Sequence, residues 1–295
     1  MKYIIAIDIG GSTFRSGLFT KSLKSIDISI QDKIRYYSNK ESIRDAIIEQ
    51  VNCLILKNDI KKNDILGLGI ALPGPLDSSK GVILNTPNLT IFQNYNIVKE
   101  LSSILKLDVM IENDANLFTL GEWYKSYQNS KVTLGVTLGT GLGLGLVVNG
   151  TLFKGGNGNA MEYGVSPFNW GECEKNVCIK YIKERSRQLY GEPISPIKVE
   201  EYFKSNDKNA IKIYNEFGHN LGVVLSHIVN MIDPNIITIG GGLSKAFDCF
   251  KHSMLLSLEE NSLTFNNKNT KIFQSEFGEK SAMLGACILV KNKVG

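Results

Sequence analysis

One local pattern occurs twice in this chain, once at the N-terminus and once near the middle. In each copy an apolar run leads into a glycine-rich turn, and a second apolar run follows the turn. In the first copy the apolar runs are 3–8 and 14–19, and the turn is 8–13. In the second copy the apolar runs are 132–138 and 144–148, and the turn is 139–143. Apolar runs on either side of a glycine turn are typical of paired strands. The repetition predicts two related halves, each built around a sheet that begins with this unit.

Helical and strand patterns alternate along the rest of the chain. Helices are expected over 38–57, 209–231, 244–260 and 281–291, and buried strands over 65–71, 107–111, 236–239 and 271–274. Alternation of this kind favours an α/β fold. We expect a first α/β domain over 1–122, completed by the C-terminal helix 281–295, and a larger second domain over 123–280.

Bulk composition narrows the classes of function. Of the 295 residues, 43% are hydrophobic and 21% charged, which is ordinary for a globular protein. The net charge of +4 is spread in short pairs such as Lys61–Lys62, which argues against nucleic acid as a partner. No stretch approaches the ~20 apolar residues of a membrane span. Five cysteines, an odd number, suit the reducing cytoplasm. A cytoplasmic protein without nucleic-acid or membrane partners is expected.

The stretch Ile111–Asn116 places a carboxylate and two amides where a predicted strand passes into a predicted helix. Ligands of open α/β sheets bind at such junctions. The alternative is that Asn113 or Asp114 only caps the helix, as these residue types commonly do. Both interpretations remain open on this stretch alone.

The two glycine turns could each bring backbone N–H groups close to a phosphate. The first is Asp8–Thr13 and the second Gly139–Gly143. Neither contains GxGxxG, and the chain has no GxxxxGK[ST], so neither a dinucleotide site nor a P-loop is indicated. A glycine turn without a ligand is the alternative for each. Two such loops facing each other could hold a nucleoside triphosphate.

Further segments carry weaker signals. Leu72–Asp77 and Asn85–Leu89 are proline-containing loops of fixed shape, and Gly240–Gly242 could lie against a flat group such as adenine. Helix capping by Ser244 is the alternative for the triple glycine. No histidine falls in any of the glycine or Asn/Asp loops, so a general base would have to be a carboxylate.

Taken in order, these segments resemble the ROK family (repressors, open reading frames, kinases) of sugar kinases, within the actin–hexokinase superfold. The resemblance runs nearly end to end. It is carried by Asp8-Ile9-Gly10-Gly11-Ser12-Thr13-Phe14-Arg15, Leu72-Pro73-Gly74-Pro75-Leu76-Asp77, Thr86-Pro87-Asn88-Leu89, Glu112-Asn113-Asp114-Ala115-Asn116, Thr137-Leu138-Gly139-Thr140-Gly141-Leu142-Gly143, and Asp233-Pro234 with Ile239-Gly240-Gly241-Gly242-Leu243-Ser244.

The resemblance implies a fold and a reaction. The fold would be two actin-like, ribonuclease H-like α/β domains with mixed five-stranded sheets around a central cleft. The reaction would be phosphoryl transfer from ATP to a hexose hydroxyl, with Asp114 as the general base. Asp8 would hold Mg²⁺ through water or ATP. Phosphates and adenosine would lie against Gly10, Gly11, Ser12, Thr13, Thr137, Gly139, Thr140, Gly141, Gly241 and Gly242. The sugar would lie against Gly74, Asn88, Asn113, Asp114 and Glu162.

Three departures from the family pattern affect its zinc and sugar positions. Val165 stands where Glu-x-Gly-His has its histidine, and Gly171 replaces the first cysteine of Cys-x-Cys-Gly-x-x-Gly-Cys-x-Glu. Lys180 replaces the final glutamate of that motif. With Cys173 and Cys178 as the remaining cysteines, we expect no structural zinc, which needs about four ligands. Because two usual sugar contacts have changed, the expected substrate is a modified hexose, either an amino sugar like kanosamine or an N-acetylated one.

The leading hypothesis is therefore an ATP- and Mg²⁺-dependent hexose kinase acting on the 6-hydroxyl of glucose or of such a modified hexose. A transcriptional repressor would carry an N-terminal helix-turn-helix segment, whereas this chain begins directly at the strand containing Tyr3. A catalytically weak sugar sensor is the other alternative, suggested by Val165 and Lys180. Family members are often homodimers, which the sequence does not decide.

Overall fold

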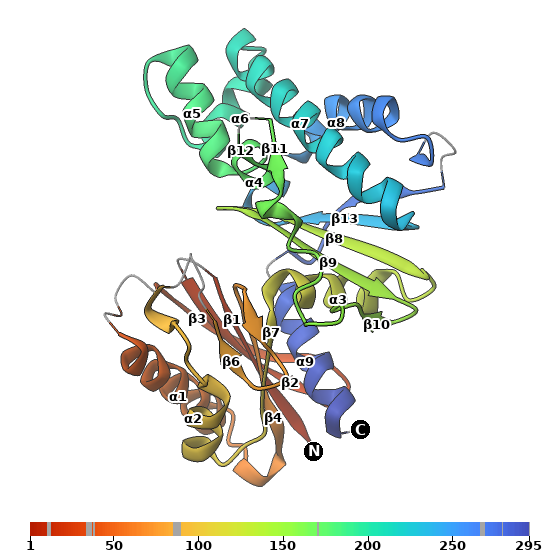
Figure 1. Cartoon of the computed structure of the whole chain (residues 1–295). Coiled ribbons are helices and arrows are strands. Elements are labelled where there is room, and N and C mark those ends of the chain that lie inside the picture. The colour runs from red at the N-terminus through yellow and green to blue at the C-terminus, as the bar shows by residue number, and fades with distance from the viewer. Residues whose placement is uncertain are drawn as a thin grey trace. The chain divides into compact units, whose positions relative to one another are not determined.

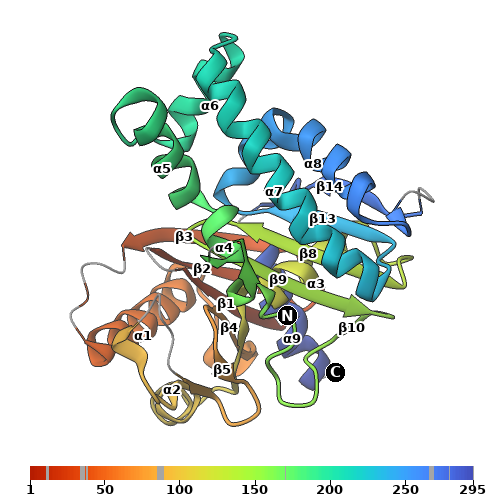
Figure 2. The same ribbon diagram turned by 45° about the horizontal axis from the view of Figure 1, so that its top comes forward.

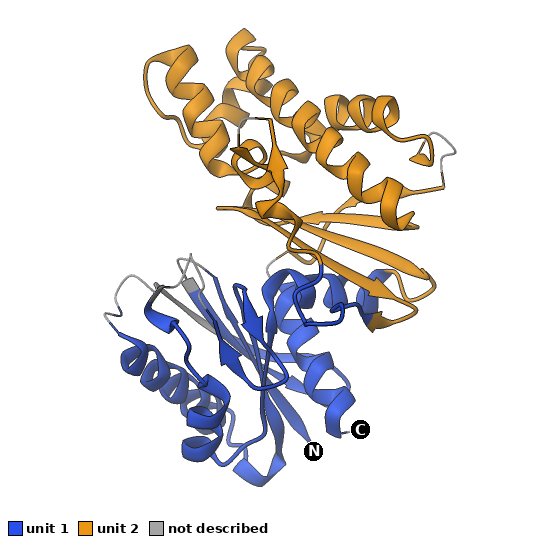
Figure 3. Cartoon of the chain, in the orientation of Figure 1, with its two compact units in different colours: residues 1–126, 152–160, 279–295 blue, residues 127–151, 161–278 orange. Residues whose placement is uncertain are grey.

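The chain divides into two compact units, each with its own sheet and core (Figure 3). The computed structural model describes residues 1–10, 13–33, 37, 39–84, 90–169, 171–265, 269–278 and 280–294. Unit 1 contains residues 1–126, 152–160 and 279–295, and unit 2 contains residues 127–151 and 161–278. The C-terminal segment thus returns to the first unit, because its helix packs on the first sheet.

Unit 1 is built on a mixed five-stranded sheet in the order β3-β2-β1-β4-β7 (Figure 1). The strands are β1 (Tyr3–Ile9), β2 (Thr13–Thr20), β3 (Ser25–Lys33), β4 (Ile65–Leu72) and β7 (Val109–Asn113). The first three pair antiparallel, while β1, β4 and β7 run parallel to one another. Parallel strands end at a common edge, so β1, β4 and β7 present their carboxyl ends together.

Helices cover both faces of this sheet (Figure 1). On one face, α1 (Lys40–Lys57) and α2 (Ile97–Leu105) enclose an aliphatic core with the sheet. On the other face, α3 (Asp114–Ser126) and α9 (Lys280–Val294) pack against each other and α9 also contacts β1, β4 and β7. A short hairpin of β5 (Leu76–Asp77) and β6 (Val82–Ile83) follows β4.

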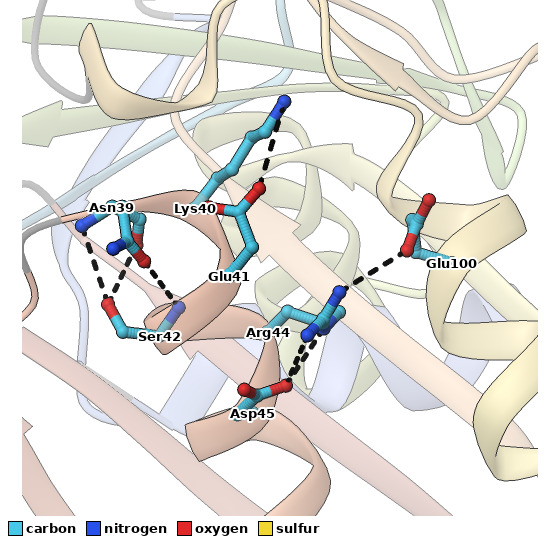
Figure 4. A network of polar contacts seen from close by, with 7 residues as sticks. All are labelled: Asn39, Lys40, Glu41, Ser42, Arg44, Asp45 and Glu100. Carbon is cyan, nitrogen blue, oxygen red and sulfur yellow. Dashed lines mark hydrogen bonds and ion pairs between the residues drawn. The ribbon is translucent and has the colours of Figure 1, made fainter.

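Local polar contacts define the start of α1 and connect it to α2 (Figure 4). The Asn39 side chain accepts a hydrogen bond from the Ser42 N–H at 2.8 Å, and the Asn39 N–H donates back to Ser42 Oγ. This reciprocal capping satisfies N–H groups that the first helical turn leaves without partners. Arg44 pairs with Asp45 at 2.8 Å and with Glu100 of α2 at 3.5 Å. The carboxylate of each pair is exposed, so the contribution of these pairs to stability is small.

Small residues allow α9 to approach α3 and β4 closely. A Cβ at Gly285 would stand 2.0 Å from the Leu117 carbonyl oxygen, and one at Gly121 would stand 2.0 Å from that of Ser281. In β4, a Cβ at Gly69 would lie 2.4 Å from the Ala286 carbonyl oxygen. The Ser281 hydroxyl also donates a buried hydrogen bond to Glu122 of α3. The C-terminal helix is therefore fitted to the helix that begins at Asp114.

Unit 2 repeats the topology of unit 1 in its own five-stranded sheet, ordered β10-β9-β8-β13-β14. The strands are β8 (Val132–Leu138), β9 (Leu142–Val148), β10 (Thr151–Leu152), β13 (Ile236–Gly240) and β14 (Lys271–Gln274). β8 pairs antiparallel with β9, while β8, β13 and β14 are parallel. The two halves and mixed five-stranded sheets expected from the sequence are thus confirmed.

The helices of unit 2 follow the hairpin of β8 and β9. Helices α7 (Lys208–Ile232) and α8 (Phe247–Asn261) pack side by side and share a core with β8 and β13 (Figure 2). The smaller elements of unit 2 are β11 (Pro167–Phe168), β12 (Gly171–Glu172), α4 (Cys173–Asn176), α5 (Ile179–Tyr190) and α6 (Pro196–Lys204), with 3-10 turns at Tyr163–Val165 and Gly242–Ala246. Unit 1 has 3-10 turns at Lys62–Asp64 and Thr90–Phe92.

The structure differs from the sequence expectations at three places. Residues 152–160, expected in the second domain, lie in unit 1, where Lys154 pairs with Glu112. Ser244 does not cap α8, because its hydroxyl donates to the Gly241 carbonyl within a 3-10 turn and the helix begins at Phe247. Strand β3 and helices α2, α5 and α6 were not expected. Within the described ranges, no helix is both long and apolar enough to cross a membrane.

The close approach of α9 to α3 yields a stability prediction. In Gly285→Ala the added Cβ meets backbone, which cannot move aside as a side chain can. We expect a loss of about 1–3 kcal/mol in the free energy of unfolding from overpacking, measured by urea denaturation. Gly156→Ala is the control, because a Cβ there meets nothing within 4 Å. A Gly285→Ala variant as stable as wild type would contradict this packing.

Candidate functional site

The strand-to-helix junction of unit 1 is formed by the end of β7 and the start of α3. Asn113 Oδ1 accepts hydrogen bonds from the N–H groups of Ala115 and Asn116, at 2.9 and 3.2 Å. Asn113 therefore caps α3, as one of the two sequence interpretations allowed. Asp114 is the first residue of the helix, half-buried, and its Oδ1 accepts from the Ala115 N–H at 2.8 Å.

Strand register brings further expected residues to the same edge of the first sheet. Asp8 on β1 is level with Ala71 on β4, which is level with Glu112 on β7. Leu72 and Asn113 are paired one position further on. The carboxyl ends of these parallel strands therefore gather Asp8, Gly10, Gly74, Asn113 and Asp114. Gly11, Ser12 and Asn88 lie outside the described residues, and Thr13 begins β2.

Glu112 is a buried carboxylate that the sequence did not single out for a role. Its side chain is only 1% exposed. Oε1 accepts from the Asn113 N–H at 2.9 Å and from Asn116 Nδ2 at 3.2 Å, and Oε2 lies 2.8 Å from Lys154 Nζ. Burying a carboxylate is costly unless it is paired and hydrogen-bonded. These contacts meet that requirement directly behind Asn113 and Asp114.

In unit 2 the glycine segments also gather at the carboxyl edge of a sheet. Thr137 on β8 is level with Gly240 on β13. In the turn after β8, the Gly139 N–H donates to the Gly141 carbonyl at 3.0 Å, and the Gly139 carbonyl accepts from the Ile179 N–H at 2.9 Å. The structure therefore fixes the turn that contains Gly139, Thr140 and Gly141, with the start of α5 beside it.

The adenosine candidates Gly241 and Gly242 adjoin that turn. Gly241 has φ +83°, and a Cβ there would stand 2.4 Å from the Leu138 carbonyl oxygen, so only glycine fits. By contrast, open space surrounds Gly139 and Gly242 where a Cβ would stand. Backbone that is open on one side and fixed on the other suits contact with a flat or anionic ligand.

Glu162 directly precedes the 3-10 turn Tyr163–Val165. A Cβ at Gly164 would stand 2.5 Å from the Leu142 carbonyl oxygen, so this turn packs directly on β9. The Glu174 carboxylate lies against Gly141, with Oε2 2.5 Å from where its Cβ would be. Although Glu162 is exposed as a whole, desolvation of its carboxylate and, secondarily, the charge of Glu174 raise its pKa. Glu174 was missed by sequence reasoning, although it occupies the glycine position of the altered cysteine motif.

The altered cysteine segment keeps two cysteines, and both lie inside unit 2. Cys173 and Cys178 are buried in the core of unit 2, and burial raises the pKa of both thiols. Across the described parts of the chain, no group of three or more His, Cys, Asp or Glu side chains could hold a metal ion. Val165 and Lys180, which stand at the altered family positions, are both exposed.

Comparison with known proteins identifies the family. The family description "ROK family" matches residues 4–293. This chain belongs to the ROK family. The N-acetyl-D-glucosamine kinase of Histophilus somni is 30% identical over 307 residues, covering 96% of this chain and 97% of that protein. The glucokinase of Halalkalibacterium halodurans is 26% identical over 322 residues, covering 99% and 96%.

A solved ROK structure has the same fold. The ROK family glucokinase from Streptomyces griseus, in complex with glucose and AMPPNP, superposes with a TM-score of 0.83 at 22% identity. The match covers 98% of this chain and 99% of that one. The mixed sheets of both units are therefore those of the ROK fold.

The Glu162–Glu174 proximity predicts a pH effect. If the Glu162 carboxylate accepts hydrogen bonds from substrate, protonation at low pH weakens binding, and its raised pKa moves this loss to higher pH. In Glu174→Gln the like charge is removed, so the acid limb of kcat/KM should shift to lower pH. The shift is partial because desolvation of the Glu162 carboxylate, the larger cause of its raised pKa, remains.

The matched control is Glu172→Gln, since Glu172 pairs with Lys175 and is not among the causes of the shift at Glu162. The measurement is kcat/KM for the sugar between pH 4 and 8 in all three proteins. An acid limb that stays in place in Glu174→Gln, or moves equally in Glu172→Gln, would show that this interaction does not control Glu162.

Proposed function

We propose that this ROK-family chain is an ATP-dependent hexose kinase that transfers the γ-phosphate of ATP to the 6-hydroxyl of its sugar. Asp114 is the general base that accepts the proton of the attacking hydroxyl. The observation that carries the proposal is the junction of β7 and α3, where the Asn113 side chain caps the first turn of the helix and fixes its start. A carboxylate at a fixed, partly accessible helix start is what a positioned base requires.

The division of roles follows the two sheet edges. Unit 1 supplies Asp114 for the nucleophile, while Asn113 and Gly74 at the same edge contact the sugar. Asn88, outside the described residues, belongs to the same group by its motif. Unit 2 supplies Glu162 as a further acceptor for sugar hydroxyls. Because the Oδ1 of Asn113 is occupied by the cap, its amide nitrogen is the end that contacts the sugar.

ATP and Mg²⁺ fit the residues that are present. The turn of Gly139–Gly141 and the first glycine turn bind phosphates, with Thr137 and Thr13 adjoining them, and Gly241–Gly242 lie against adenosine. The open backbone at Gly139 and Gly242 supports this assignment. Asp8 supplies an oxygen ligand of the type that Mg²⁺ prefers, directly or through water. When bound, Mg²⁺ neutralises charge on the phosphates.

The substrate class follows from the altered positions. Val165 and Lys180 remove two contacts typical of the family, and Glu174 adds a carboxylate beside Glu162. The relatives named above include both an N-acetyl-D-glucosamine kinase and a glucokinase. We infer a hexose modified with an amino or N-acetylamino group as the substrate, in preference to plain glucose.

A coupled ATP-consumption assay against glucose, N-acetyl-D-glucosamine, N-acetyl-D-mannosamine, glucosamine and kanosamine tests the function. Turnover with at least one sugar, and higher kcat/KM for a modified hexose than for glucose, is expected. Sugar binding without turnover on any of them would instead support the catalytically weak sugar sensor.

Substitution of the base makes a sharper prediction. Asp114→Asn keeps the side-chain shape but cannot accept the proton, so kcat should fall by at least roughly a hundredfold. ATP affinity, measured by calorimetry, should stay within about twofold, because the carboxylate acts on the nucleophile. Asp108→Asn is the matched control, because Asp108 is exposed and directly precedes β7, at the end of that strand away from Asp114. Near-normal kcat in Asp114→Asn would show that Asp114 has no catalytic role and only helps to start the helix.

A further inference from the structure

Lys154 joins three segments of unit 1 through one amino group. It lies in 152–160, a segment that leaves unit 2 and returns to it, yet belongs to unit 1. Its Nζ is 2.8 Å from Glu112 Oε2 and donates a hydrogen bond to Ser78 Oγ at 3.1 Å. Ser78 lies in the turn between β5 and β6, and Glu112 is near the end of β7. The contact therefore links sequence-distant segments at the edge that carries Asp114.

The two partners of this ion pair differ greatly in exposure. The Glu112 side chain is 1% exposed, whereas that of Lys154 is 38% exposed. Removing one partner of a buried pair is severe only when the other is left buried and uncompensated. Loss of Lys154 leaves Glu112 in that state. Loss of the Glu112 charge leaves an ammonium that still reaches solvent and Ser78.

Glu112 in turn holds the backbone that presents Asp114. Its Oε1 accepts from the Asn113 N–H and from Asn116 Nδ2, and Asn113 caps the helix on which Asp114 is the first residue. A buried carboxylate that loses its countercharge is left uncompensated, which favours movement of the strand end that carries it. The charge of Lys154 thus maintains the hydrogen bonds that orient the junction.

We propose that Lys154 is a positioning residue for phosphoryl transfer, acting on Asp114 through Glu112 and Asn113. The proposal rests on the proposed role of Asp114. Lys154 also closes the loop that follows it, since its carbonyl accepts from the Ala160 N–H at 3.1 Å, and Glu162 comes two residues later. One residue therefore anchors the segment leading to a candidate sugar contact and sets the charge behind the candidate base.

The first test replaces Lys154 by Met, which keeps the length of the side chain but removes its charge. With ATP and N-acetyl-D-glucosamine, and in parallel with glucose, kcat should fall roughly tenfold to a hundredfold, as expected when a reacting group is displaced slightly. KM for ATP should stay within about twofold. Lys80→Met is the matched control, because Lys80 lies in the β5–β6 hairpin that contains Ser78 and forms a surface ion pair with Asp77 there.

Two further variants separate positioning from general damage. Glu112→Gln should be milder than Lys154→Met, because of the difference in exposure. The double variant Glu112→Gln/Lys154→Met has no unpaired buried charge, so it should recover most of the kcat lost in Lys154→Met. Lys154→Arg should also retain most of the activity. A double variant no better than Lys154→Met, or a Lys154→Met enzyme with wild-type kcat, would overturn the proposal.

Amide hydrogen exchange gives a readout that does not depend on turnover. Exchange at 113–116 should be faster in Lys154→Met than in wild type and unchanged in Lys80→Met. Unchanged exchange at these amides in Lys154→Met would overturn the positioning role. If instead Asp114→Asn retains full kcat while exchange responds as expected, the assignment of the base fails and the anchoring of the junction by Lys154 stands.

Discussion

The parallel pairing of strands constrains this molecule more than any other feature. In each sheet, parallel strands end at one edge, and the segments that leave that edge carry the candidate site residues. Asp8, Gly74 and Asp114 reach the edge in unit 1, and Gly139 and Gly241 reach it in unit 2. Because the strands lie in register, residues far apart in sequence come together without any loop having to fold around a ligand.

Candidate site residues at the edge of a sheet bring charged side chains next to the hydrophobic core. Glu112 sits inside the protein, and the ammonium of Lys154 with two hydrogen-bond donors stabilises its charge. Further along the helix, Gly121 of α3 and Gly285 of α9 let these two helices pack at backbone distance. Asp114 is thus held from the strand side by charge and from the helix side by close packing.

Much of this architecture could be predicted from the sequence. The repeated strand–glycine turn–strand unit and the order of the motifs predicted two related halves, because apolar runs and glycines report local structure. Strand β3 was missed although Ile26, Ile28 and Ile30 alternate with polar residues. Helices α5 and α6 were missed because charged residues obscure their apolar faces.

The candidate site could be predicted where a motif carries its residues, and not where residues distant in sequence meet. Asn113 and Asp114 stand together in a recognisable stretch. The pairing of Lys154 with Glu112, by contrast, depends on segment 152–160 joining the first unit, and no local pattern reports that. The position of Glu174 against Gly141 likewise depends on how α4 packs. Long-range contacts of this kind need the fold.

The central claim is that this chain moves phosphate to a sugar hydroxyl, and following the phosphate tests it most directly. Single-turnover reaction of ATP labelled on the γ-phosphate, in the presence of N-acetyl-D-glucosamine or glucose, separates sugar phosphate from inorganic phosphate. The account predicts that the label appears in a sugar phosphate, at the 6-position by phosphorus NMR. Label recovered only as inorganic phosphate, or retained on ATP while sugar is bound, would contradict it.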